Sequence, residues 1–158
     1  MNKIDTYKTL LPQIESLVAG ESDTIANMAN VAAVLHEAFG FWWTGFYRVT
    51  NERVNALTNE RIEELVLGPF QGPLACTRIP HNKGVCGTAW HRAETVIVPN
   101  VHEFAGHIAC SSASNSEIVV PILHDGQVVA VLDIDSTDFN TFDETDRLYL
   151  EQIAKMLK

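Results

Sequence analysis

Three cysteines, Cys76, Cys86 and Cys110, are the residues of this 158-residue sequence most able to do covalent chemistry. Their number is odd and the first residues carry no apolar export signal, so we expect no structural disulfide framework. A thiol reacts as its thiolate, which is only slightly populated near neutral pH at a free pKa of about 8.5. Cys110 ends the small-residue segment Gly106-His107-Ile108-Ala109-Cys110, which lets a ligand approach closely. For each cysteine, a reactive nucleophile and a buried inert thiol remain equally open.

A zinc site is a second interpretation, because several cysteines and histidines offer ligand types that zinc prefers. No Cys-x-x-Cys pair is present, and the spacing from Cys76 to Cys86 matches no standard zinc knuckle. We therefore expect no metal, and keep a zinc or redox-sensing module as an alternative. The candidate ligands are Cys76, Cys86, His102, His107 and Cys110.

Acidic residues form a third group, in which Asp133 and Asp135 end an apolar strand and Glu117 opens its expected hairpin partner. Residues two apart on a strand share a face, so Asp133 and Asp135 project together. Solvated charges at a strand end are the common alternative. If the sheet is covered on this face, crowded carboxylates resist joint ionisation, and one of them stays protonated. Such a site binds a cation and donates a proton.

The turn of this hairpin provides a test of the acidic group. A two-residue turn at Asp125-Gly126 pairs Glu117 with Ile134 and so places Glu117 on the wrong face. For the three carboxylates to converge, the ladder must slip by one residue. We therefore predict a bulge near Pro121, which cannot donate a ladder hydrogen bond, or a turn of odd length.

The aromatic segment from Phe41 to Val49 reads as a strand that places Trp43 and Tyr47 on a common face. Most of its rings are expected in the core, although one could wall a ligand pocket. A first helix is predicted near the start of the chain, and Pro12 limits how far back it extends. A second helix is capped by Ser22 and ends at Gly40, and the last helix begins after a cap at Thr141 or Asp143. Other strands are predicted at 64–67, ending at Gly68-Pro69, and at 76–79, 95–98, 118–123 and 128–135. Helices at both ends with strands between them predict an α+β fold, with helices packed on a central antiparallel sheet.

Composition excludes several classes of protein. The length predicts one domain over residues 1–158, and the net charge of -9 leaves no basic face for a nucleic acid. The longest apolar runs are far too short to span a bilayer, so we expect no membrane partner and a cytoplasmic protein.

An ordered set of short segments, dense from Phe41 to Phe142, carries a family resemblance. It comprises Leu67-Gly68-Pro69-Phe70-Gln71-Gly72, Ala75-Cys76, Ile79-Pro80, Gly84-Val85-Cys86-Gly87, His107-Ile108-Ala109-Cys110, Ser114-Asn115-Ser116-Glu117-Ile118-Val119-Val120-Pro121 and Leu132-Asp133-Ile134-Asp135-Ser136. The set resembles the free methionine-(R)-sulfoxide reductases, which are single GAF-domain enzymes. The resemblance implies a GAF-like fold, in agreement with the α+β prediction.

The resemblance also implies roles for single residues. Cys110 matches the nucleophile, Cys76 the resolving cysteine, and Cys86 a third, auxiliary cysteine. The carboxylates Glu117, Asp133 and Asp135 match substrate-binding positions. Trp43 matches an aromatic wall of the substrate pocket, and Tyr47 lies on the same strand face as Trp43.

The reaction implied is reduction of free L-methionine-(R)-sulfoxide through a cysteine sulfenic acid and an intramolecular disulfide, which thioredoxin reduces. No cofactor is expected, and a homodimer through the terminal helices is consistent with the family. A GAF sensor that only binds a small ligand is the main rival, because a fold does not fix a function.

Overall fold

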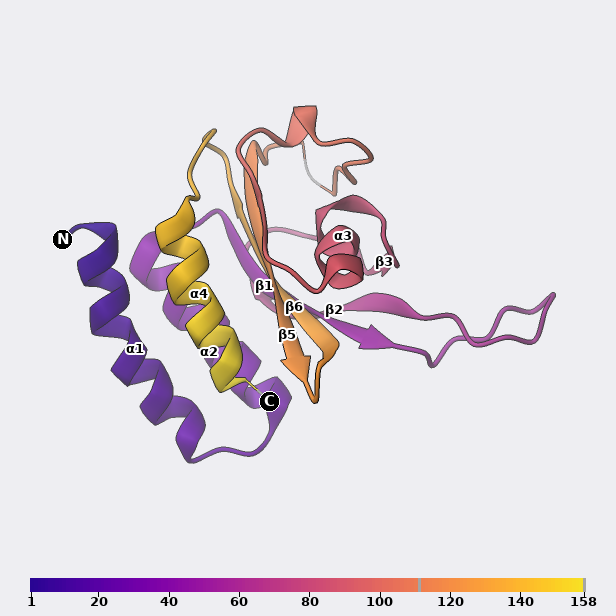
Figure 1. The fold of residues 1–158 in the computed structure, drawn as a ribbon, viewed down its shortest axis with the longest axis horizontal. Coiled ribbons are helices and arrows are strands. Elements are labelled where there is room, and N and C mark those ends of the chain that lie inside the picture. Colours follow the sequence, from indigo (N-terminus) through magenta and orange to yellow (C-terminus); the bar gives the residue numbers. More distant parts are fainter. Residues whose placement is uncertain (111, 158) are drawn as a thin grey trace.

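The computed structural model describes residues 1–110 and 112–157 as helices layered on one antiparallel sheet (Figure 1). The sheet has six strands in the order β3-β2-β1-β6-β5-β4. In chain order the elements are α1 (Lys3–Ala19), α2 (Thr24–Phe39), β1 (Trp43–Thr50), β2 (Glu64–Gln71), β3 (Arg78–Pro80), α3 (Gly84–Arg92), β4 (Val96–Val98), the 3-10 helix η1 (Val101–Glu103), β5 (Ser116–His124), β6 (Gln127–Ser136) and α4 (Glu144–Met156). This confirms the predicted α+β arrangement.

The two faces of the sheet are covered differently. On one face α2 packs against β1 and β2, α4 packs against β5, and α1 lies outside against α2 and α4 (Figure 1). Between these helices and the sheet lies the larger apolar core, which includes Phe46, Leu132 and Ile134. On the other face, α3 and the segment from η1 to β5 enclose a smaller core. Within the described residues, no helix is long and apolar enough to cross a membrane.

The helix boundaries correct two predictions. Pro12 lies inside α1 rather than limiting it, and both Pro12 and Lys8, the residue one turn earlier, are exposed. The cap of α2 is Asp23, whose side chain accepts from the backbone N–H of Ala26, and not Ser22. Gly40 ends α2 in the left-handed conformation, as predicted.

The β1–β2 pair corrects a third prediction. β2 does not end at Gly68-Pro69 but continues to Gln71. The pairing register shifts between Gly45 and Tyr47, so that Gly68 and Pro69 form a bulge in β2. Proline is tolerated at a bulge because its missing N–H is not needed in the ladder. Residues 51–63 form the long projecting connection between these strands, as the polar sequence indicated (Figure 1).

The β5–β6 hairpin has the predicted slip, at a different residue. Asp125 and Gly126 form a two-residue turn with positive φ at both positions, and His124 pairs with Gln127. The register then shifts beside Leu123, because β6 carries the extra residue Val129. Pro121 itself pairs regularly with Val131, so the bulge lies on the opposite strand from the one predicted. Glu117 consequently pairs with Asp135 and not with Ile134.

Candidate active site

Glu117, Asp133 and Asp135 lie on the sheet face that α3 covers. Glu117 and Asp135 are directly opposite each other on β5 and β6, and Asp133 is two residues before Asp135 on the same face. Glu117 and Asp133 are only 6% and 5% exposed. The hydroxyl of Ser114 donates to Oδ1 of Asp135 at 3.0 Å. The carboxyl groups are therefore gathered in the interior, as the slipped register requires.

Burial changes the protonation of all three carboxyls. Burial, and then repulsion from Asp133 and Asp135, raises the pKa of Glu117 well above its usual range. Burial and the charge of Asp133 likewise raise the pKa of Asp135, and burial raises that of Asp133. The group therefore retains protons at pH values where exposed carboxylates have lost them, and it can donate a proton to a bound ligand.

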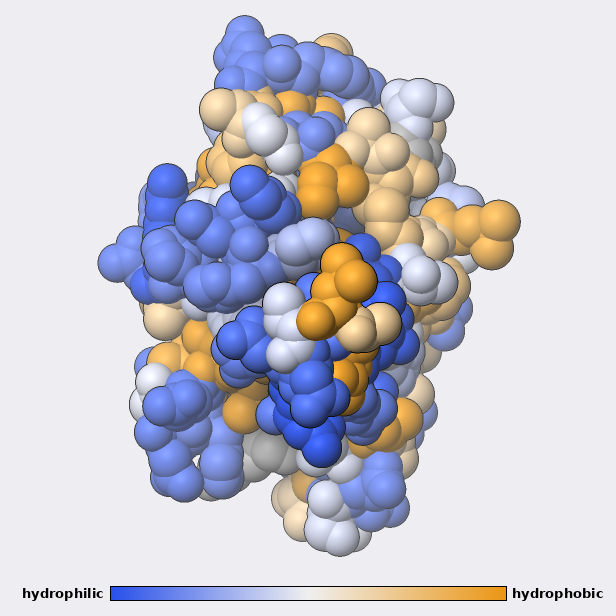
Figure 2. Space-filling model, turned by 90° about the vertical axis from the view of Figure 1, so that its right-hand side faces the viewer, coloured by the Kyte–Doolittle hydropathy of each residue, from blue (hydrophilic) through white to orange (hydrophobic). Residues whose placement is uncertain are grey.

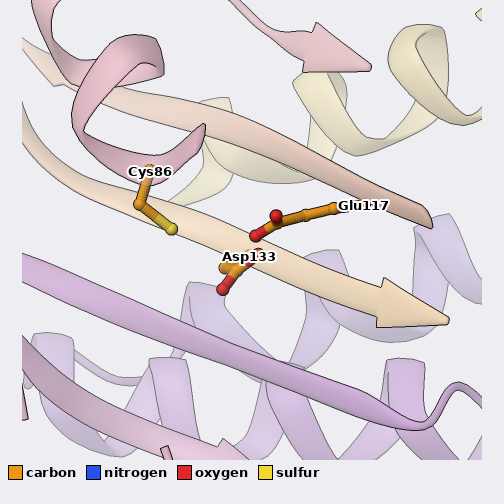
Figure 3. Close-up of side chains that lie close together, drawn as sticks. All are labelled: Cys86, Glu117 and Asp133. Atoms are coloured by element: carbon orange, nitrogen blue, oxygen red, sulfur yellow. The ribbon is translucent and has the colours of Figure 1, made fainter. Parts of the chain in front are cut away.

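Cys86 faces these carboxyls from α3 (Figure 3). The Sγ atom of Cys86 and one carboxylate oxygen each of Glu117 and Asp133 all lie within 4.8 Å of one another. Cys86 is a free thiol and is buried, and burial, followed by the charges of Asp133 and Glu117, raises its pKa. The Cys86 thiol is thus protonated and poorly nucleophilic in this state.

Trp43 and Tyr47 occupy the same face on β1, as predicted, and both are buried. The ring of Trp43 lies over Gly45, which pairs with Asp133, and a Cβ at Gly45 would fall 2.6 Å from the Trp43 ring. Trp43 donates from Nε1 to the carbonyl of Pro73 at 3.0 Å. These contacts fix the Trp43 ring beside the carboxyl group.

Cys76 and Cys110 are joined by a disulfide, with their Cα atoms 5.4 Å apart. Cys76 precedes β3, and its carbonyl accepts a hydrogen bond of 2.9 Å from the hydroxyl of Tyr47. Cys110 follows η1 in the same loop as His107, whose Nε2 lies 3.9 Å from Oε1 of Glu117. Burial lowers the pKa of His107, with His102 adding to the effect. The disulfide is therefore placed beside the carboxyl group by two separate loops.

One cavity connects these groups. About 50 Å³ inside it is open to the centres of water-sized molecules, and its described lining includes neither lysine nor arginine. All the predicted site residues except Cys76 line it: Trp43, Tyr47, Cys86, Cys110, Glu117, Asp133 and Asp135. The surface on the side where the β1–β2 connection projects is mostly hydrophilic, with scattered hydrophobic groups (Figure 2). The cavity thus combines the carboxyls of Glu117 and Asp133 with the aromatic rings of Trp43 and Tyr47.

The predicted zinc ligands do not come together as a set. Cys76 and Cys110 are bonded to each other in the disulfide and cannot act as thiolate ligands. Cys86 lies with carboxylates rather than with His102. The sequence reasoning missed Ser114 as a partner of Asp135, and Trp42 and Ile108 as further lining residues. Only the Ser114–Pro121 segment of the family resemblance carried a signal for Ser114.

Comparison with known proteins identifies the family. Residues 21–156 match the family model of the GAF domain. Free methionine-R-sulfoxide reductase of Escherichia coli (strain K12) is 43% identical over 100% of this chain and 90% of its own length. The X-ray structure of free methionine-R-sulfoxide reductase from Neisseria meningitidis, in complex with its substrate, is 55% identical with a TM-score of 0.90, covering 99% of this chain and 89% of that one.

The chain belongs to the free methionine-R-sulfoxide reductase family. The structure of fRMsr of Staphylococcus aureus in its reduced form is also similar, with 43% identity, a TM-score of 0.85, and coverage of 96% of this chain and 92% of that one. Membership of this reductase family confirms the sequence-based resemblance, including the GAF fold. The cavity beside the disulfide is therefore our candidate active site.

Proposed function

We propose that this chain reduces free L-methionine-(R)-sulfoxide to L-methionine, with Cys110 as the nucleophile. The observation that carries the proposal is one cavity bordered both by Cys110, a partner in the disulfide, and by three carboxyls, of which Glu117 and Asp133 are buried. A redox-active thiol and a proton donor are the two groups that sulfoxide reduction needs. Family membership supports the same reaction.

Substrate recognition rests on the carboxyl group. Glu117, Asp133 and Asp135 have no positively charged partner, since neither lysine nor arginine is among the described residues of the cavity lining. The α-ammonium group of the substrate provides that partner. Peptide-bound methionine sulfoxide has no free ammonium at this position. Binding a peptide in the cavity would therefore leave the carboxylates without a positively charged partner. Trp43 and Tyr47 provide the apolar surface for the methyl-thio end.

The chemical step transfers the sulfoxide oxygen to Cys110. A protonated carboxyl donates its proton to the sulfoxide oxygen while the Cys110 thiolate attacks the sulfur. The attack joins the two sulfur atoms, and the hydroxyl then passes from the substrate sulfur to the sulfur of Cys110. As the sulfur–oxygen bond of the substrate and the sulfur–sulfur bond break, methionine leaves with the electron pair and Cys110 becomes a sulfenic acid. His107 has a lowered pKa and is neutral near pH 7, so the substrate ammonium is the positive charge that favours the thiolate.

Recycling uses Cys76. The Cys76 thiol attacks the sulfenic sulfur of Cys110 and releases water, which gives the disulfide. Thioredoxin, a dithiol protein, then reduces that disulfide to two thiols and becomes oxidised itself. Cys86 lies on α3 and takes no part in the disulfide, so its role is auxiliary, through contact with the carboxyls.

Three further expectations rest on the sequence and on the resemblance. The 158-residue chain acts as one GAF domain, two chains pair through their terminal helices, and the protein works in the cytoplasm. Light scattering of the purified protein tests the pairing, with a mass of one chain as the contradicting result.

A single turnover without any recycling partner tests the proposed reaction. Fully reduced protein should release one equivalent of methionine from free methionine-(R)-sulfoxide and then stop. N-acetylmethionine sulfoxide is the matched control because it differs only at the ammonium group, and it should release far less. Equal release from both compounds would contradict carboxyl recognition, and no release from either would contradict the reductase function.

A further inference from the structure

Cys86, Glu117 and Asp133 bring three metal-ligating atoms to one point of the interior. They come from α3, β5 and β6 and point toward one another (Figure 3). Their ligand atoms lie within 4.8 Å of one another, and all three residues are buried. This set differs from the zinc ligands suggested by the sequence and shares only Cys86 with them.

A separate observation indicates that the group accommodates a cation. Asp133 is only 5% exposed, and its buried Oδ1 accepts no close hydrogen bond from the described residues, although the Cys86 thiol and the Glu117 carboxyl interact with this side chain. An unpartnered buried carboxylate oxygen is costly. The described lining of the cavity offers no lysine or arginine to satisfy it. A bound cation would supply the missing partner.

We propose that Cys86, Glu117 and Asp133 form a binding site for a thiophilic divalent cation of the Zn²⁺ type. Zinc binds thiolate sulfur at about 2.3 Å and carboxylate oxygen at about 2.0 Å, so tetrahedral ligand atoms lie about 3.3–3.6 Å apart. The ligand atoms, now within 4.8 Å of one another, therefore approach by up to about 1.5 Å per pair around the ion. Three protein ligands leave a fourth position for water, and the thiol proton passes to solvent on binding.

Cys86 separates this site from the ammonium site of the proposed function. An ammonium group needs only acceptors, which Glu117 and Asp133 already supply, whereas a thiolate ligand selects zinc over magnesium or calcium. The two cations share the carboxylates and exclude each other. Zinc is therefore an inhibitor that competes with methionine sulfoxide, a consequence that rests on the proposed function, whereas zinc binding itself does not.

The binding test uses protein in which Cys76 and Cys110 cannot act as ligands. In the disulfide form Cys86 is the one free thiol. A double variant, Cys76→Ser with Cys110→Ser, gives the same isolation without the disulfide, in case the loop closes the entrance. Either the disulfide form or the double variant, or both, should bind one equivalent of Zn²⁺ in a calorimetric titration. With Co²⁺ it should show thiolate-to-metal charge-transfer absorption and tetrahedral d–d bands.

Variants then assign the ligands. Cys86→Ser should remove the charge-transfer absorption and weaken Zn²⁺ binding by about 100-fold or more, and Asp133→Asn should also weaken binding. Asp125→Asn, at the exposed hairpin turn, is the matched control and should bind like the parent protein. Circular dichroism should show that each variant is folded. Absence of binding in both parent forms, or binding unchanged by Cys86→Ser, would overturn the site.

Competition separates the metal site from the proposed function. Methionine sulfoxide should displace Co²⁺ from the protein at concentrations where glycine does not, because both chelate free metal through the same amino and carboxylate groups. Equal displacement by glycine would overturn the shared use of the carboxylates. A protein that binds Zn²⁺ through Cys86 but fails to reduce methionine sulfoxide would keep the metal site and refute the reductase function.

Discussion

Replacing Glu117 with glutamine should stabilise the ligand-free protein as the pH rises. In the folded chain, burial and two neighbouring carboxyls raise the pKa of Glu117 well above its usual range, whereas in the unfolded chain it is about 4.3. Below the unfolded pKa both states are protonated and the raised pKa has no effect. Above it the unfolded chain ionises while the folded chain keeps its proton, so the folded state loses stability until Glu117 itself ionises. Glutamine imitates the protonated carboxyl and removes this loss.

The size of the effect follows from proton linkage. Each retained proton costs the folded state up to about 1.4 kcal/mol of unfolding free energy for every pH unit in this window. The difference between Glu117→Gln and wild type should therefore grow by up to that amount per unit. Loss of repulsion on Asp133 and Asp135 acts in the same direction. The same substitution should weaken substrate binding, because glutamine cannot ionise to pair with the ammonium when the substrate binds.

Urea unfolding of the disulfide form, measured at intervals from about pH 5 to about pH 8, checks this prediction. Glu52→Gln is the matched control, since Glu52 is exposed and loses the same charge. The Glu117→Gln curve should separate upward from wild type with rising pH, and the Glu52→Gln curve should not. Parallel curves for wild type and Glu117→Gln would refute the buried, proton-retaining carboxyl group.

The remaining predictions concern turnover and packing. Cys110→Ser should abolish methionine release in a single turnover, and any release would reject it as the nucleophile. Cys76→Ser should release one equivalent but fail to recycle with thioredoxin, so normal steady-state turnover would exclude a resolving role. Tyr47→Phe loses the 2.9 Å hydrogen bond to the Cys76 carbonyl, which is worth about 1 kcal/mol. Disulfide formation should therefore slow about fivefold, and an unchanged rate of thiol loss would contradict this. Gly87→Ala places a Cβ 2.7 Å from the Pro80 carbonyl oxygen and should cost about 1–3 kcal/mol, which equal unfolding midpoints would disprove.

Side-chain alternation placed Asp133 and Asp135 on one face, and it required a slipped ladder before Glu117 could join them. The face of each strand follows from a period of two, so the need for one slipped residue could be stated before any coordinates. The position of the slip could not be predicted, because several residues near the turn can form a bulge with a similar free-energy cost. The extra residue is Val129, and not a residue beside Pro121, since Pro121 fits the ladder.

Local patterns failed where tertiary contacts decide the structure. Helix α3 could not be predicted from the sequence, because Gly84 to Trp90 are all buried and have no polar face to create a helical period. The third cysteine is carried by this helix, so its approach to Glu117 and Asp133 was equally hidden. The disulfide partners came only from the family resemblance, as spacing alone left every cysteine pairing open.

A stereo-resolved assay tests the central claim most directly. Racemic free methionine sulfoxide is supplied with the protein, thioredoxin, thioredoxin reductase and NADPH, and the remaining epimers are separated. The account predicts that consumption stops at half the substrate, with all of the R epimer converted to methionine and the S epimer untouched. Consumption of the S epimer, or none at all with active coupling enzymes and reduced cysteines, would contradict it.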